Sequence, residues 1–166
     1  MLYLRKLSVS DGMEIYTMLQ EIDANDNGFH NKVCGMTYAR YQQWIAREWA
    51  FDNGDLEDWM VPQTSYWLYD DDRPIGYGRL RHCLNDKLRE TSGHIGYAVR
   101  RTERGKGYGT RLLALLLEEC RKREITEVQI GANKDNIASN RVIQKNGGIL
   151  IRTAENKNFY HILITR

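Results

Sequence analysis

The spacing of apolar residues in the first third of the chain predicts a strand followed by two helices. Residues 2–7 alternate roughly between apolar and polar side chains, as an edge strand does. Apolar residues then recur at helical spacing from Met13 to Ile22, and Ser10-Asp11 offers an N-cap directly before them. A second helix is predicted over residues 37–50, between polar segments that are expected to be loops.

From residue 64 onward, short apolar or alternating runs separated by turn residues indicate strands. The predicted strands lie at residues 65–69, 75–84, 93–99, 126–130, 149–153 and 159–165. A leucine-rich helix is predicted from Tyr108 to about Arg123, where basic residues complement the helix dipole. A shorter helix over residues 137–146 takes Asp135 or Asn136 as its N-cap and ends at the glycine pair that follows.

The resulting order, β-α-α-β-β-β-α-β-α-β-β, predicts a mixed α/β fold in which a mostly antiparallel central sheet is flanked by helices. With 166 residues, 42% of them hydrophobic and 28% charged, the chain has the composition of one globular domain that spans residues 1–166. No apolar run is long enough to cross a bilayer, and the N-terminus lacks the features of a signal peptide. We therefore expect a cytoplasmic protein without a membrane partner.

Cysteine usage and overall charge exclude several classes of function. The three cysteines are odd in number and widely spaced, so neither a disulfide framework nor a metal site is expected. The net charge of +2 is too small to indicate nucleic-acid binding, and no nucleic acid is expected as a partner. Charge is nevertheless uneven: residues 1–62 carry 5 Lys/Arg and 10 Asp/Glu, whereas residues 63–166 carry 19 and 12. An anionic ligand should prefer the second part.

A glycine-rich loop, residues 100–110, joins a predicted strand to the leucine-rich helix. Glycines at 105, 107 and 109 permit positive φ and leave backbone N–H groups unshielded at a helix N-terminus, where the dipole also favours an anion. Four cations and one acid in the same segment favour a pyrophosphate. The alternative is a glycine-rich connection with a solvated basic face. A P-loop is excluded because Gly107 follows Lys106, and the spacing G-x-G-x-G differs from the dinucleotide fingerprint.

Two motifs in this region resemble the GCN5-related N-acetyltransferase (GNAT) family. Residues 104–109 match the pattern R/Q-x-x-G-x-G/A in the same strand-loop-helix setting, and residues 136–147 look like the family's second signature, an Asn-led helix that ends in glycine. Residues 61–64, 79–82 and 93–97 further resemble a bacterial branch of predicted acetyltransferases. The resemblance covers most of the chain and implies an enzyme, an acetyl-CoA-dependent N-acetyltransferase.

The resemblance also implies how acetyl-CoA would bind. Its pyrophosphate would lie on the amides of the glycine loop, with the pantetheine arm beside the preceding strand. Carried over position by position, the cofactor-binding residues are Tyr97, Ala98, Val99, Arg104, Gly105, Lys106, Gly107, Tyr108, Gly109, Thr110, Asn136 and Ser139. Lys145 either reaches a phosphate of CoA or remains a solvated helix residue.

The chemistry of amine acetylation requires a base, because an amine with a pKa of about 10 is mostly protonated at neutral pH. The family often places a Glu on the strand before the glycine loop, but one such position is Gly93 here. The next residue, His94, is our predicted base, and the alternative is a structural histidine bonded to a neighbouring strand. Glu90 is the second candidate.

The general acid is also in question. Ile143 stands where the family frequently has a Tyr that protonates the leaving thiolate. Tyr97 and Tyr160 are candidates only if the fold brings them near the thioester. Because a thiol has a pKa of about 8.5, the absence of an acid should cost less than it would for an alkoxide leaving group.

The acceptor is expected to be a primary amine of a small molecule or peptide. Arg79 and Arg81 share one face of a strand and are predicted either to bind a carboxylate of this substrate or to form surface ion pairs. The acidic first part of the chain favours a cationic acceptor instead. The sequence does not distinguish a monomer from a homodimer. A non-catalytic CoA-binding or regulatory module is the alternative function.

Overall fold

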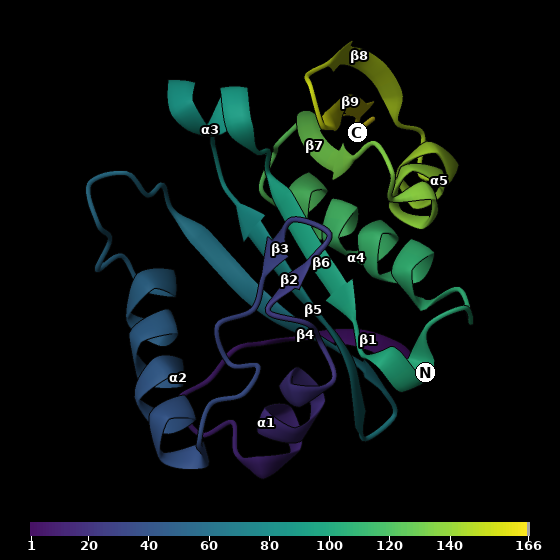
Figure 1. The fold of residues 1–166 in the computed structure, drawn as a ribbon. Coiled ribbons are helices and arrows are strands. Elements are labelled where there is room, and N and C mark those ends of the chain that lie inside the picture. Colours follow the sequence, from purple (N-terminus) through teal and green to yellow (C-terminus); the bar gives the residue numbers. More distant parts are fainter. Residues whose placement is uncertain (166) are drawn as a thin grey trace.

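Two antiparallel sheets form the centre of the computed structural model, which describes residues 1–165 (Figure 1). Strand order is β1-β4-β5-β6 in the first sheet and β7-β9-β8 in the second, and β2 pairs with β3 in a separate hairpin. The strands are β1 (Leu2–Lys6), β2 (Asn25–Asp26), β3 (Phe29–His30), β4 (Gln63–Asp70), β5 (Arg73–Arg81), β6 (Ile95–Val99), β7 (Glu127–Asn133), β8 (Ile149–Thr153) and β9 (Lys157–Leu163). The helices are α1 (Met13–Gln20), α2 (Tyr38–Asp52), α3 (Asp86–Thr91), α4 (Tyr108–Lys122) and α5 (Ile137–Lys145), with a short 3-10 turn at η1 (Arg101–Glu103).

Both faces of the larger sheet are covered by helices, and the alternation of β4 shows how. Tyr66 and Leu68 point into a core formed with α4, whereas Trp67 and Tyr69 point into a second core formed with α1 and α2. Figure 1 shows these helices on opposite sides of the sheet. Because apolar side chains leave both faces of the strand, β4 is buried along almost its full length.

The predicted mixed α/β fold is confirmed, but three short elements were not predicted: the β2–β3 hairpin, α3 and η1. The two strands of the hairpin are each two residues long, too short for an alternating pattern. Their turn is Asn27-Gly28, in which both residues have positive φ, and this dipeptide was the available signal. Helix α3 begins after Asn85, whose side chain accepts a hydrogen bond from the amide of Leu88.

The expected N-cap of α1 is corrected by the structure. Gly12 occupies the cap position and provides no side-chain bond. The Asp11 carboxylate is instead buried, where it accepts hydrogen bonds from Arg5 at 2.5 Å, from the amide of Ser8 and from the indole N–H of Trp67 at 2.7 Å. A buried carboxylate requires such partners, so Asp11 links β1, β4 and the start of α1.

The two sheets meet where β6 begins, through one backbone and one side-chain hydrogen bond. The amide of His94 donates to the carbonyl of Gln129 at 2.8 Å, and the amide of Gln129 donates to the imidazole Nδ1 of His94 at 2.9 Å. A Cβ on Gly93 would lie 2.5 Å from the same carbonyl oxygen, so only glycine permits this approach. Beyond this point, among the strands of residues 1–165, β6 pairs only with β5 and β7 only with β9. The strands therefore separate along the rest of their length.

We predict that this junction depends on the hydrogen-bond acceptor at position 94. His94→Ala leaves the buried amide of Gln129 without a partner and should lower the free energy of unfolding by about 1–3 kcal/mol. His94→Asn, whose amide oxygen can occupy the place of Nδ1, should lose less than about 1 kcal/mol. Urea denaturation measures both values, and equal losses in the two variants would contradict the acceptor role.

The pH dependence of stability provides a second test. Burial is the main reason that the pKa of His94 lies below its ordinary value of 6.5. As the pH falls, position 94 is therefore protonated in the unfolded chain before it is protonated in the folded protein. The contribution of His94 to the free energy of unfolding is complete above pH 6.5 and declines as the pH falls toward its pKa in the folded protein. The His94→Asn variant should lose less stability than the wild type between pH 7 and pH 5. Parallel declines would show that His94 does not contribute.

Candidate active site

The glycine loop begins α4 with a cap that leaves its first amides open. Gly107 is the N-cap residue and has φ of +84°. Because it lacks a side chain, it cannot cap the first amides of the helix as Ser, Thr, Asp or Asn would. Gly105 also has positive φ, at +76°. A Cβ at either glycine would meet no protein atom within 4 Å. The loop is therefore a backbone cradle with open space in front of it, a geometry suited to an anion such as pyrophosphate.

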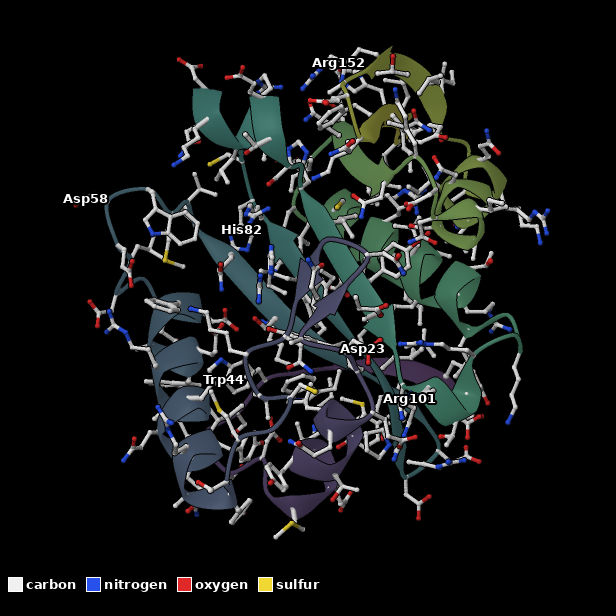
Figure 2. All side chains as sticks on the ribbon, in the orientation of Figure 1. Asp23, Trp44, Asp58, His82, Arg101 and Arg152 are labelled. Carbon is white, nitrogen blue, oxygen red and sulfur yellow. The ribbon has the colours of Figure 1, made fainter. Side chains whose placement is uncertain are left out.

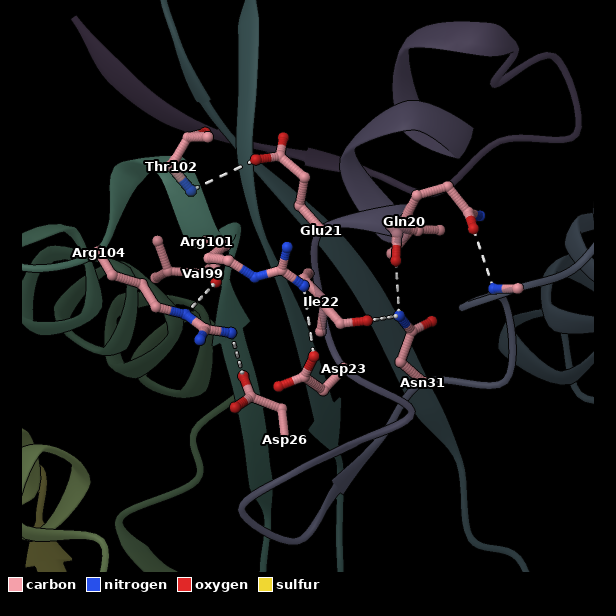
Figure 3. Close-up of polar contacts among 12 residues, drawn as sticks. Gln20, Glu21, Ile22, Asp23, Asp26, Asn31, Val99, Arg101, Thr102 and Arg104 are labelled. Atoms are coloured by element: carbon pink, nitrogen blue, oxygen red, sulfur yellow. Dashed lines mark hydrogen bonds and ion pairs between the residues drawn. The ribbon is translucent and has the colours of Figure 1, made fainter.

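The four cations of this loop form ion pairs within the chain, although its charge had suggested that they would bind the anionic ligand. Arg100 is paired with Glu21. Arg101 lies 3.4 Å from Asp23, and the position of these two side chains can be followed in Figures 2 and 3. Burial opposes ionisation of Glu21, but hydrogen bonds from Thr102 and Arg100 hold the pKa of its carboxyl below the ordinary value. These contacts attach the loop to the end of α1. They position the backbone amides rather than present charge to a ligand.

Arg104 and Lys106 are also engaged within the chain. Arg104 donates to the carbonyl of Val99 at 3.2 Å and pairs with Asp26 at 3.3 Å (Figure 3). Lys106 pairs at 2.9 Å with the buried carboxylate of Glu103. Arg104 thus connects β6 to the β2–β3 hairpin at the opening between β6 and the loop.

A groove of about 450 Å³ runs from this loop along β6 to α5. Of the predicted cofactor-binding residues, only Lys106 does not line it; the lining includes Tyr97, Ala98, Val99, Arg104, Gly105, Gly107, Tyr108, Gly109, Thr110, Asn136, Ser139 and Lys145. The structure therefore brings both sequence motifs to one surface. The groove lining also contains six residues that were not predicted: Asp26, Asn27, Glu103, Ala138, Arg141 and Val142.

Residues of the second motif also build the groove wall. The side chain of Asn136 caps α5 by accepting a hydrogen bond from the amide of Ser139 at 3.1 Å. The hydroxyl groups of Ser139 and Tyr97 lie 3.0 Å apart and connect α5 to β6 across the gap. Burial raises the pKa of Tyr97 to about 12, so its phenol remains protonated at neutral pH.

A second cavity, of about 280 Å³, adjoins the groove on the side of the β2–β3 hairpin. The two hollows share five residues: Asp26, Asn27, Tyr97, Asn136 and Ser139. The rest of the lining of the second cavity contains the basic or polar side chains of His30, Arg79, Arg81 and Lys157, together with glycines and a few apolar residues. A ligand in the groove and a ligand in this cavity would therefore meet beside Tyr97.

The only carboxylate that lines both hollows and stands at their junction, within residues 1–165, is Asp26. Its side chain is 14% exposed and lies against Arg104. Burial raises the pKa of Asp26 above its ordinary value, although the charge of Arg104 acts in the opposite direction. No motif indicates this residue, because its position follows from how the hairpin folds over β6 (Figure 1).

The predicted bases, His94 and Glu90, lie outside the lining of both hollows. His94 is 7% exposed and holds the junction of the sheets. Glu90 is an exposed residue of α3. The hydroxyl of Tyr160 is bonded to Asn140, whereas Tyr97 does lie at the junction of the two hollows. Of the residues predicted for proton transfer, the structure brings only Tyr97 to the site.

Within residues 1–165, no group of three potential ligands could hold a metal ion, and no helix is long and apolar enough to span a membrane. The family model "Acetyltransferase (GNAT) family" matches residues 20–148. No curated protein matches the sequence significantly.

Solved structures with the same fold include several acetyltransferases. RimL, a ribosomal alpha-N-protein acetyltransferase in complex with coenzyme A, is 18% identical with a TM-score of 0.75, covering 98% of this chain and 94% of its own. The aminoglycoside acetyltransferase AAC(6')-Ib, also with coenzyme A, is 20% identical with a TM-score of 0.68, covering 98% and 95%. Campylobacter jejuni PseH, an N-acetyltransferase in complex with acetyl coenzyme A, is 9% identical with a TM-score of 0.62, covering 99% and 100%.

We predict that the glycine cradle can be tested with a matched pair of substitutions. Gly107→Val introduces a Cβ at positive φ in front of the loop amides, and should abolish CoA binding in calorimetry while the fold is retained. Gly54→Val introduces the same strain at φ of +98°, also with open space around it, in the turn after α2. This control should bind CoA normally. If the folded Gly107→Val variant bound CoA with the affinity of the wild type, the loop would not be the CoA-binding site.

Proposed function

The chain belongs to the GNAT acetyltransferase family, and we propose that it transfers the acetyl group of acetyl-CoA to a primary amine of a small molecule or peptide. The observation that supports this most directly is the junction of the two hollows. A groove lined by the glycine loop and β6 opens beside Tyr97 into a separate polar cavity. Group transfer between two ligands requires such an arrangement, because both reacting groups must meet in one place.

We propose that the groove holds acetyl-CoA. The open amides after Gly107 would bind the pyrophosphate, and the backbone of Val99 would contact the pantetheine arm. Arg141 and Lys145 line the same groove and would bind further phosphate oxygens. Both sheets share one of the two hydrophobic cores, which supports the whole chain, residues 1–166, acting as a single catalytic domain.

When bound, acetyl-CoA supplies the acetyl thioester that the amine attacks. We assign the deprotonation of the acceptor ammonium to the Asp26 carboxylate, since it lies at the junction and its raised pKa makes it a better base than an exposed aspartate. The protonated hydroxyl of Tyr97, bonded to Ser139, would donate a proton or hydrogen bond to the departing thiolate. His94 and Glu90 remain alternative bases, which would have to act through water because neither lines the cavity.

Release of free CoA thiol, measured with a panel of primary amines, tests the proposed activity. Thiol release that depends on both acetyl-CoA and an amine is the expected result. Tight binding of acetyl-CoA without thiol release on any amine would instead support a non-catalytic CoA-binding module. Failure to bind CoA would contradict both functions.

We predict that substitution at Asp26 separates it from the earlier candidates. Asp26→Asn should lower turnover by about 10²–10⁴-fold, the usual contribution of a general base, and should remove the acidic limb of the pH profile of kcat. The matched variant His94→Asn keeps the acceptor for the amide of Gln129 and should retain turnover within about threefold. A large loss in His94→Asn with wild-type turnover in Asp26→Asn would return the role of base to His94.

A further inference from the structure

The cavity that would receive the acceptor has an excess of positive charge. Arg79, Arg81 and Lys157 all line it, whereas Asp26 is the only acidic residue that residues 1–165 contribute to its lining and is already paired with Arg104. Among residues 1–165, none of the three cations forms an ion pair with a carboxylate. This differs from the glycine loop, where each cation has an acidic partner.

Arg79 is held rigidly but is not fully satisfied. Its guanidinium lies 5.6 Å from the ring centres of both Phe29 and Tyr77 and donates to the Tyr77 hydroxyl at 2.9 Å. Its Nε is buried and has no hydrogen-bond partner in the described part of the chain. Glu48 and Asp52 stabilise its charge only through space, and the oxygens of Asp52 already accept hydrogen bonds from Gln63 and Ser65. A buried donor without a partner points to a ligand acceptor.

Arg81 and Lys157 are likewise bonded only to neutral atoms. Arg81 donates to the carbonyl of Gly93 at 2.9 Å, and Lys157 donates to the carbonyl of Thr91 at 3.0 Å. Burial and the charge of Arg79 lower the pKa of Arg81 to about 10, while burial and the charge of Arg81 lower the pKa of Lys157. The cations therefore repel one another in a partly buried space, and an anion bound between them would relieve this repulsion.

Building on the proposed function, we propose that the acceptor is a small primary amine that carries an anionic group, a carboxylate or a phosphate, and that Arg79 and Arg81 bind this group. The two arginines lie on one face of β5, two residues apart, so their guanidinium groups can converge on one anion. Asp26 then receives the ammonium end of the same molecule, beside the groove. A cavity of about 280 Å³ suits a ligand of amino-acid size, and its charge opposes a polycation.

Matched amines that differ only in charge test this proposal with the wild-type protein. We expect kcat/KM to be about 10²-fold higher for β-alanine than for β-alaninamide, or for phosphoethanolamine than for ethanolamine, with the difference mainly in KM. The amine of the amide has the lower pKa and would react faster if the anion had no site. The pair with the larger ratio of kcat/KM between charged and neutral amine shows whether the anionic group is a carboxylate or a phosphate. Equal or better use of the neutral amines or of spermidine would overturn the proposal while leaving the acetyltransferase function intact. Thiol release with none of these amines, despite CoA binding, would contradict the proposed function itself.

A pair of arginine variants then locates the anion site. Arg81→Gln should reduce the preference for the anionic amine to near unity by raising its KM, with little change for the neutral amine. Arg152→Gln is the matched control, because Arg152 also donates to backbone carbonyls and lies over an aromatic ring, yet it does not line the cavity. This control should keep the wild-type preference. An equal loss for charged and neutral amines in Arg81→Gln, or an unchanged preference, would show that Arg81 does not recognise the anion.

Discussion

The contact between His94 and Gln129 controls where the two sheets join and where they separate. Gly93 allows the backbones to approach, and the imidazole takes the place of a strand carbonyl for one further hydrogen bond. Past this point, no strand that the structure describes pairs with β6 on the side facing β7. The separation leaves room beside β6 for the groove and the adjoining cavity, with α4 and α5 closing the groove on the far side. His94 thus contributes to the site by holding its walls rather than by lining it.

The charge asymmetry along the sequence has a structural explanation that composition alone does not supply. Acidic residues from the first part of the chain, Glu21, Asp23 and Asp26, pair with Arg100, Arg101 and Arg104 of the glycine loop. These three pairs therefore offset part of the negative excess of one segment and part of the positive excess of the other within the same molecule. Neither excess indicates the charge of the ligand.

A group of cations that form no ion pair within residues 1–165 lies in a different place from the basic loop. It consists of Arg79 and Arg81 on β5 and Lys157 on β9, two strands that are far apart in the sequence and meet at the second cavity. In the proposed function, the two hollows bind anions by different means. The groove presents backbone amides at a helix N-terminus together with Arg141 and Lys145, and the cavity presents guanidinium groups held by aromatic rings and carbonyls.

Local patterns were sufficient to identify the fold class and the long helices. The resemblance of residues 104–109 and of the Asn-led helix at 136 to family signatures placed twelve of the eighteen residues that line the groove, because both motifs depend on local backbone geometry. The alternation of Arg79 and Arg81 likewise predicted a shared face. The direction of His94 and the position of Asp26 depended on tertiary structure. A change of one residue in register reverses a strand side chain, and a hairpin of two-residue strands has no pattern that shows which surface it will cover. The sequence therefore determined which backbone could hold an anion, while the packing of distant segments decided which side chains line the second cavity.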